Sequence, residues 1–504
     1  MGAGPESGIM GKKGAGITGF DMEGVTVTDK GNSAKEAAAF IIERLEKQRV
    51  NMHSLLIVKG DELVCEAYWK PYSAEKLHRM FSISKSFTAV AVGLLIDEGK
   101  VELAAPIVKY FPDLVPEDVH PWIAEMTVED CLMMRTCHAS TTYKIDMKKD
   151  WVESFFTTAP THPAGRFFNY DTSSAHTLCA LVERISGMPM LNYIKFKLPE
   201  LDLSEESYMI ADPFGVSMGG SGMVATSMDM LKFGKFIRDK GCVNGKQLLS
   251  SEYVEKCTSF LSDTRMNAPL PSEAVGYGMQ FWQNEKGSWV CYGMGGQFII
   301  NLPDLDMLVV TTADTIGRAG GNQIIYDAIY DGLYGCEEAK SFKLSLPFDK
   351  IINGLCMHSE VVIPNAPGSK VIAEIPEIYK KVVEGSTYRN SSESAVFDCF
   401  SLTVDDAVSE GCFKYTINGK DCEIHFGFGH LTEGSFPGYE MNYAASAVWN
   451  TKNTLYIRCH IIDEYIGSVH FQLNFTEEDL AIHMKKNEES LFNEYNCRVY
   501  AIKK

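Results

Sequence analysis

The 504-residue sequence lacks the features that mark several large classes of protein. It has no run of about 18 apolar residues, which disfavours a membrane-spanning helix. The Gly-rich opening segment, residues 1–20, lacks the apolar core of a secretory signal. The net charge is −19 and no stretch is rich in Lys or Arg, so we expect neither a nucleic-acid partner nor a membrane partner.

Motifs for metals and nucleotides are also missing. We find no HExxH or HxHxDH motif, no P-loop and no dinucleotide fingerprint, so we expect no metal and no cofactor. His425 and His430 lie five residues apart on a predicted strand and are interpreted as structural. Gly220-Ser221-Gly222 lacks the second glycine of a GxSxG motif, which disfavours an α/β-hydrolase. The 14 cysteines form no CxxC pair and indicate buried thiols in a reducing compartment, for which we expect the cytoplasm.

The chain is longer than a single hydrophobic core usually organises, so we expect two domains. Helical periodicity begins at Ser33, and two short strands follow, joined by a turn at Gly60-Asp61. A mainly helical stretch then occupies residues 120–260. Strand patterns return, before a further helix, at 277–282, 289–302 and 307–314. Strands at both ends of a helical block predict one sheet with helices packed against it.

A different pattern begins near residue 340, where prolines punctuate a linker-like stretch. Short alternating segments follow at 422–430, 454–463, 468–475, 480–487 and 497–504. Alternation with a period of two predicts an antiparallel β domain, a barrel or a sandwich, with a structural or substrate-gating role. The predicted boundaries are 1–32 for an N-terminal arm, 33–338 for the first domain, 339–375 for the linker region and 376–504 for the β domain.

The segment Ser82-Ile83-Ser84-Lys85 is an S-x-x-K motif. A serine hydroxyl is a weak nucleophile until a base removes its proton, and a spacing of three at the start of a helix places the lysine amine beside it. The helix N-terminus also offers free N–H groups to a developing oxyanion. A second match, residues 73–76, lies in a polar turn with no apolar helix attached. The alternative interpretation of Ser82 is a helix N-cap beside a surface lysine.

The flanking sequence resembles that of the penicillin-binding proteins and class C β-lactamases. The segment MFSISKSFTAVAVGLLIDEGKVELAAPIVKYFPDL is similar to the nucleophile region of this family, and MTVEDCLMMRTCHAS is similar to a segment that follows it. The resemblance spans roughly residues 50–330. It implies an α+β fold in which an antiparallel sheet is flanked by helices and accompanied by an all-helical subdomain. It also implies an acyl-enzyme on Ser82.

The second motif of this family is Tyr-x-Asn, and PAGRFFNYDTSSAHTLCALVERISG resembles the segment that carries it. The resemblance places Tyr170 where the family's tyrosine shuttles protons beside the lysine, here Lys85. A tyrosine can act as a base near neutral pH only beside positive charge, so the two groups would titrate as a coupled pair. Thr172 stands where asparagine is usual, so we expect weaker hydrogen bonding to a β-lactam. The alternative interpretation of Tyr170 is an ordinary tyrosine at the edge of the core.

The third motif of the family is a strand with Lys-Thr-Gly or His-x-Gly. Residues 290–297, VCYGMGGQ, resemble the form found in its family VIII esterase and 6-aminohexanoate-oligomer hydrolase branch. Val290 falls at the position of the lysine that binds a substrate carboxylate, so we expect weak or no β-lactamase activity. The Gly293 and Ser82 N–H groups are the predicted oxyanion hole, although the glycines here can also serve only a bulge. The residues predicted to contact the substrate are Thr172, Trp282, Tyr292, Gly295, Gly296 and Gln297.

Together these patterns predict a serine hydrolase that cleaves a small-molecule ester or amide through an acyl-enzyme on Ser82, with Lys85 and Tyr170 carrying protons. One alternative is an acyltransferase that passes the acyl group to an alcohol or amine. Another is a non-catalytic binding or sensor protein that keeps the fold. The sequence leaves open the substrate, whether the chain forms a homo-oligomer and whether the β domain covers the active site.

Overall fold

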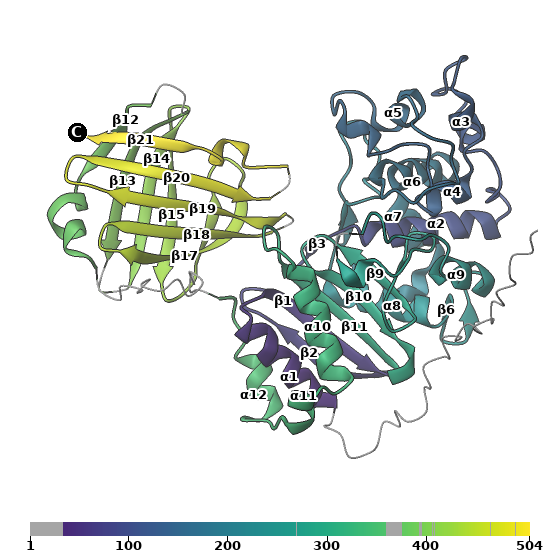
Figure 1. Cartoon of the computed structure of the whole chain (residues 1–504), viewed down its shortest axis with the longest axis horizontal. Coiled ribbons are helices and arrows are strands. Elements are labelled where there is room, and N and C mark those ends of the chain that lie inside the picture. Colours follow the sequence, from purple (N-terminus) through teal and green to yellow (C-terminus); the bar gives the residue numbers. More distant parts are fainter. Residues whose placement is uncertain are drawn as a thin grey trace, which may run out of the picture.

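Helices and a sheet form the first domain of the protein, and β-strands form a barrel beside it (Figure 1). The computed structural model describes residues 34–268, 270–358, 375–392, 396–405, 407, 409–463, 465–488 and 490–504. The predicted N-terminal arm and much of the predicted linker region therefore lie outside the described residues.

A six-stranded antiparallel sheet forms the centre of the first domain. Its strands, in spatial order, are β2 (Glu62–Tyr68), β1 (Asn51–Lys59), β11 (Met307–Asp314), β10 (Gln297–Leu302), β9 (Trp289–Gly293) and β8 (Trp282–Gln283). The early hairpin joins the late strands through β1 and β11, where Asn51 pairs with Asp314 and Lys59 with Met307. Figure 1 shows this junction as purple strands beside teal-green ones. The prediction of one sheet built from both ends of the domain is confirmed.

Both faces of the sheet are buried, because side chains alternate along each strand and both faces meet helices. On β1, Leu55 and Ile57 belong to one core, and Leu56 and Val58 to the other. The core that contains Leu55 includes residues of α1 and α10, and the core that contains Leu56 includes residues of α8. The helices around the sheet are α1 (Ala34–Lys47), α8 (Ser227–Arg238), α10 (Gly321–Leu333), α11 (Glu337–Ser341) and α12 (Phe348–Asn353).

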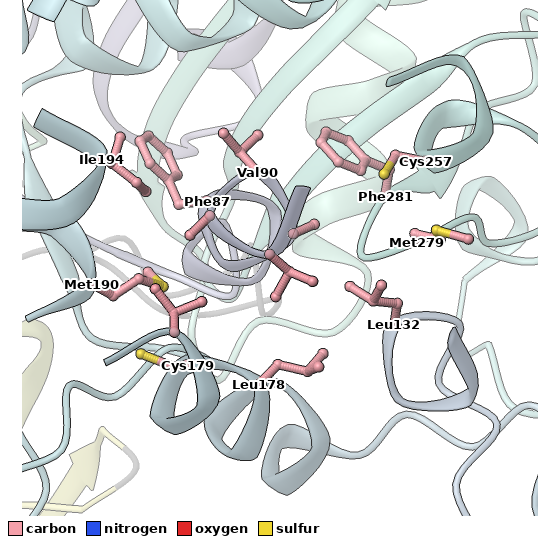
Figure 2. Close-up of a cluster of buried hydrophobic side chains, with 14 of the residues drawn as sticks. Phe87, Val90, Leu132, Leu178, Cys179, Met190, Ile194, Cys257, Met279 and Phe281 are labelled. Atoms are coloured by element: carbon pink, nitrogen blue, oxygen red, sulfur yellow. The ribbon is translucent and has the colours of Figure 1, made fainter. Parts of the chain in front are cut away.

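A helical subdomain surrounds α2 (Ser84–Asp97), which is apolar on nearly every side rather than amphipathic. Figure 2 shows Phe87 and Val90 of α2 enclosed by Leu132, Leu178 and Ile194 from three other helices. The surrounding helices are α3 (Pro121–Ala124), α4 (Val128–Leu132), α5 (Trp151–Thr157), α6 (Thr172–Ser186), α7 (Met190–Lys197) and α9 (Ser251–Thr258). Burial on all sides fixes both the position and the rotation of α2, and so fixes the direction in which the side chains of its first turn point.

The C-terminal strands form a closed barrel, which confirms one of the two predicted forms of the β domain. A parallel pairing of Gly427 with Ser446 closes it between β15 and β17, and β16 (Thr432–Phe436) pairs with the remaining part of β17. Inward-facing aromatic side chains such as Phe413 and Phe471 fill the interior. The closed circuit in the described residues consists of β12 (Thr387–Asn390), β13 (Phe397–Asp405), β14 (Glu410–Ile417), β15 (Lys420–Phe428), β17 (Met441–Thr451), β18 (Thr454–Ile462), β19 (Ile466–Phe475), β20 (Asp479–Asn487) and β21 (Arg498–Lys503).

The strand expected at 277–282 is wrong for most of its length. Within it only Trp282 belongs to β8. The backbone before it turns away from the sheet: the Met279 N–H donates to the Cys257 carbonyl in α9, and Gln280 has a φ of 65°. A segment whose hydrogen bonds go to a helix end cannot also continue a ladder, so this stretch passes along the helical subdomain.

None of the helices in the described ranges combines the length and the apolar character that crossing a membrane requires. The 14 cysteines all lie in those ranges and all are free thiols.

Candidate active site

The candidate nucleophile, Ser82, lies in a tight turn between β3 (His78–Phe81) and α2. The residue before it, Phe81, has a φ of 46°, in the left-handed region that non-glycine residues seldom adopt. The Phe81 ring packs against Arg79, whose guanidinium carbon is 4.7 Å from the ring centroid. Strain of this kind persists only where surrounding packing holds it, and it is common at functional sites. The helix begins at Ser84, two residues after the candidate nucleophile.

Lys85 lies one turn after the serine, and its side chain is buried against the same site. Its Nζ is 2.9 Å from Ser82 Oγ and 2.6 Å from the Gly220 carbonyl oxygen, to which it donates. Gly220 comes from the loop before β5 (Met223–Ala225), far away in the sequence. A Cβ added to Gly220 would overlap Thr172 Cγ2, so glycine is needed for this close approach. The sequence analysis did not identify Gly220, because a carbonyl ligand leaves no side-chain signature.

Tyr170 approaches the serine from the segment that precedes α6. Its ring centroid is 4.8 Å from Lys85 Nζ, and its hydroxyl is near enough to Ser82 for that serine to lower its pKa. Trp282 stacks on the same ring at a centroid distance of 5.4 Å. Burial raises the pKa of Tyr170 well above its usual value, while the nearby Ser82 hydroxyl acts in the opposite direction. The hydroxyl is therefore protonated in the free protein at neutral pH.

The next two residues fix the position of this tyrosine. Asp171 caps α6 by accepting from the Ser173 N–H at 2.8 Å, and it also accepts from Thr136 Oγ1 at 3.2 Å. Burial raises the pKa of Asp171 to about 6, although the hydrogen bonds from Ser173 oppose this. Thr172 follows with its methyl group directed at Gly220, beside Lys85. The structure thus brings Ser82, Lys85, Tyr170 and Thr172 together.

The turn between β9 and β10 carries the remaining predicted residues. A Cβ on Gly293 would overlap the Met80 carbonyl oxygen, so this glycine lets β9 cross closely behind β3. Gly295 and Gly296 have φ values of 90° and 96°, which favour glycine. Gln297 is turned inward, because its Nε2 donates to the carbonyls of residues 294 and 313. Its amide braces the turn and is not part of the group around Ser82.

Two further side chains place this turn relative to the catalytic cluster. Tyr292 lies 6.3 Å from Trp282 between ring centroids, and its hydroxyl oxygen accepts a hydrogen bond from Asn322 Nδ2 at 2.6 Å. Val290 is fully buried in the core on the α1 side of the sheet. Its apolar side chain therefore offers no group that could bind a substrate carboxylate.

The barrel reaches the same site through the β18–β19 turn. A Cβ on Gly295 would lie 3.2 Å from Ile466 Cδ1, and the Tyr465 ring centroid is 4.8 Å from the guanidinium carbon of Arg79. Asn51 Nδ2 and His460 Nδ1 form a buried hydrogen bond of 2.9 Å across the same junction. The barrel therefore abuts the glycine turn and the strand that leads to the nucleophile.

One group of metal-ligating side chains occurs in the described part of the chain, on the outer face of the barrel. The ligand atoms of Cys412, Glu423 and His425 all lie within 4.8 Å of one another. Glu423 already contacts Lys414 Nζ at 3.3 Å and His425 Nε2 at 3.1 Å. These residues belong to β14 and β15 and are not part of the cluster around Ser82.

An antiparallel sheet between helices, a helical subdomain and a Ser-x-x-Lys turn facing a tyrosine define the class of the penicillin-binding-protein and β-lactamase fold. The family model described as beta-lactamase matches residues 37–329, and the chain belongs to that family. Its relatives include the 6-aminohexanoate-dimer hydrolase of Paenarthrobacter ureafaciens, 24% identical over 292 residues that cover 53% of this chain and 73% of that protein.

Solved structures with a similar fold match different shares of this chain. The octameric penicillin-binding protein homologue from Pyrococcus abyssi is 17% identical, with a TM-score of 0.47, and the match covers 94% of this chain and 100% of that one. The D-amino acid amidase from Ochrobactrum anthropi is 16% identical, with a TM-score of 0.46, and covers 59% of this chain and 98% of that one.

Proposed function

We propose that the protein is a serine hydrolase that cleaves an ester or amide bond of a small molecule through an acyl-enzyme on Ser82. The observation that carries the proposal is the 2.9 Å contact between Lys85 Nζ and Ser82 Oγ, with the Tyr170 ring centroid 4.8 Å from the same amine. A structural N-cap serine would need neither partner. The names of the hydrolase and amidase relatives support the same class of chemistry.

In the proposed first step Lys85, when neutral, accepts the Ser82 proton along their contact while it still donates to the Gly220 carbonyl. The Ser82 oxygen attacks the substrate carbonyl carbon, and the carbonyl π electrons move to oxygen. The Ser82 N–H and the Gly293 N–H are the proposed donors to this oxyanion. Tyr170 is suited to give its proton to the leaving group, because its raised pKa keeps it protonated. The tetrahedral intermediate then collapses as the bond to the leaving group breaks.

The second step returns the enzyme to its starting state. Water gives a proton to the Tyr170 phenolate left by the first step and adds to the acyl carbon. The tetrahedral intermediate then collapses, the bond to Ser82 breaks, and Ser82 regains its proton from Lys85. Thr172, Trp282, Tyr292, Gly295 and Gly296 are proposed to contact the acyl group. The buried Val290 offers no cation for a β-lactam carboxylate, so we expect weak or no β-lactamase activity.

The test of this function is the Ser82→Ala variant with a panel of p-nitrophenyl esters and p-nitroanilides. We expect the rate to fall by about 10³-fold or more, because the attacking atom is lost while binding remains. Mass spectrometry of the unmodified protein with a fluorophosphonate probe should show one adduct on Ser82. Retained ester hydrolysis by a folded Ser82→Ala protein would refute the assignment.

The same panel separates the two alternative functions. An acyltransferase would give a new ester or amide when an alcohol or amine acceptor is added, with less free acid. A binding or sensor protein would label at Ser82 but release the acyl group too slowly for turnover.

A further inference from the structure

We propose that Glu273 and the cavity beside the β9–β10 turn form a subsite for a protonated amine carried by the substrate. This inference rests on the proposed function and narrows its substrate class to esters or amides that bear an ammonium group. The cavity has a volume of about 270 Å³ and is lined in part by Glu273, Tyr292, Met294, Gly295, Thr315 and Asn322. Met294 and Gly295 belong to the turn that also carries predicted acyl contacts, and Tyr292 belongs to the strand before it.

Glu273 is the unusual member of this lining. Its side chain is buried, with the residue only 2% exposed, and Oε1 has no hydrogen-bond partner among the described residues. The Asn322 amide is near enough to the carboxylate to lower its pKa. Asn322 is itself fixed, since its Nδ2 is 2.6 Å from Tyr292 Oη and its Oδ1 accepts from Thr315 Oγ1 at 2.9 Å. The carboxylate is thus held in place with one oxygen unused.

A buried carboxylate oxygen without a donor is unfavourable unless a ligand supplies one. The cation in the cavity lining is Arg318, but its guanidinium donates to the carbonyls of Gln48 and Arg49, at 2.7 Å and 2.8 Å. Burial raises the pKa of Glu273 to about 7, which agrees with a carboxylate that has no permanent counterion. A ligand ammonium would supply both the missing hydrogen bond and the missing positive charge. A substrate carboxylate would be repelled.

The subsite is close enough to act on the catalytic cluster. The charge of Glu273 is one of the causes that raise the pKa of Tyr170, and it has the same effect on Tyr292. Tyr292 in turn lies beside Trp282, which stacks on Tyr170. In the proposed complex, a substrate whose carbonyl is at Ser82 extends past these rings towards Glu273.

Binding of small probes tests the subsite without any turnover. We would titrate hexylammonium and 1-hexanol into the wild-type protein, Glu273→Gln and Glu285→Gln by calorimetry. Because a hydrogen bond between charged groups is stronger than one between neutral groups, we expect hexylammonium to bind wild type about 10- to 100-fold more tightly than hexanol. Glu273→Gln should lose this preference. Glu285 is an exposed neighbour that accepts from Ser272 at 3.4 Å, so Glu285→Gln controls for general loss of negative charge and should keep it.

Turnover then tests the substrate class. We would compare kcat/KM for 4-aminobutanoyl and 6-aminohexanoyl p-nitroanilides with that for butanoyl and hexanoyl p-nitroanilides. Wild type should favour the amino compounds, mainly through KM, and Glu273→Gln should remove that advantage. Equal binding of hexylammonium and hexanol to wild type, or an unchanged preference in Glu273→Gln, would overturn the subsite. Loss of turnover in Ser82→Ala with an unchanged preference in Glu273→Gln would overturn the subsite alone and leave the hydrolase proposal standing.

Discussion

Replacing Gly220 with alanine should displace Lys85, the proposed base, although the lysine itself is unchanged. The new methyl would overlap Thr172 Cγ2 and lie 3.1 Å from the Thr172 carbonyl oxygen and 3.6 Å from Lys85 Nζ. Relief requires the loop to move, which lengthens the 2.6 Å bond between the Gly220 carbonyl and Lys85 Nζ. Because a displacement of about 1 Å can cost about 100-fold in rate, we expect kcat to fall by about 10- to 100-fold. This corresponds to about 1.4–2.7 kcal/mol in activation free energy.

A second substitution separates this steric cause from a general loss of folding. Thr172→Ser removes only the methyl group that the alanine would meet first, while it keeps the hydroxyl. The Gly220→Ala, Thr172→Ser double variant should therefore recover to within a few-fold of the Thr172→Ser rate. The assay is steady-state hydrolysis of a p-nitrophenyl ester, with urea denaturation of all four proteins as the stability control. Wild-type kcat in Gly220→Ala, or no recovery in the double variant, would refute the reasoning about how Lys85 is held.

Three further predictions concern the tyrosine, the buried carboxylate and the barrel. Tyr170→Phe keeps the ring stacked on Trp282 but removes the hydroxyl. We therefore expect kcat to fall by about 10²- to 10³-fold with little change in melting temperature. Near-normal rates would assign proton transfer to Lys85 alone. The pKa of Glu273 is about 7 in the folded protein and 4.5 in an unfolded chain. Ionisation of this buried carboxyl group therefore lowers the free energy of unfolding by its full amount above pH 7, and the loss disappears as the pH falls towards 4.5. Denaturant unfolding of Glu273→Gln should show a gain over wild type of at most about 3 kcal/mol at pH 8 and little gain near pH 4.5, and an equal gain at both values would contradict this. Ile466→Val removes the Cδ1 methyl group that lies near Gly295, so we expect KM for substrates with bulky acyl groups to fall at unchanged kcat. An unchanged KM for these substrates would show that the barrel does not shape the acyl site.

The parts of the site that the sequence predicts are those set by short-range geometry. Ser82 and Lys85 are three residues apart next to an apolar helix, and that spacing brings them together whatever the rest of the chain does. Tyr170 follows from the resemblance of its flanks. Gly220 and Glu273 contribute a carbonyl and a carboxylate from loops that only the tertiary fold brings near, so no local pattern indicates them.

The same reasoning explains which strands were predicted. β20 and β21 in the barrel alternate between core and surface, and β18 and β19 do so over part of their length, so a period of two identifies them. β17 does not, because its residues 443–449 are all buried: Tyr443 and Ala445 face the barrel core, whereas Ala444 belongs to the core of the first domain. A strand covered on both faces loses its polar positions and with them the signal of a strand.

The proposed ammonium subsite and the proposed proton transfer affect one another through charge. An ionised Glu273 is one of the causes that hold the pKa of Tyr170 high, along with burial. A ligand ammonium that pairs with Glu273 cancels that negative charge, so it lowers the pKa of Tyr170 and makes its hydroxyl a stronger acid towards the leaving group. A neutral substrate of the same length leaves the charge in place. A substrate amine would then add to binding and also to the chemical step, and Glu273→Gln, which removes the charge permanently, would give neutral substrates part of the same benefit in kcat.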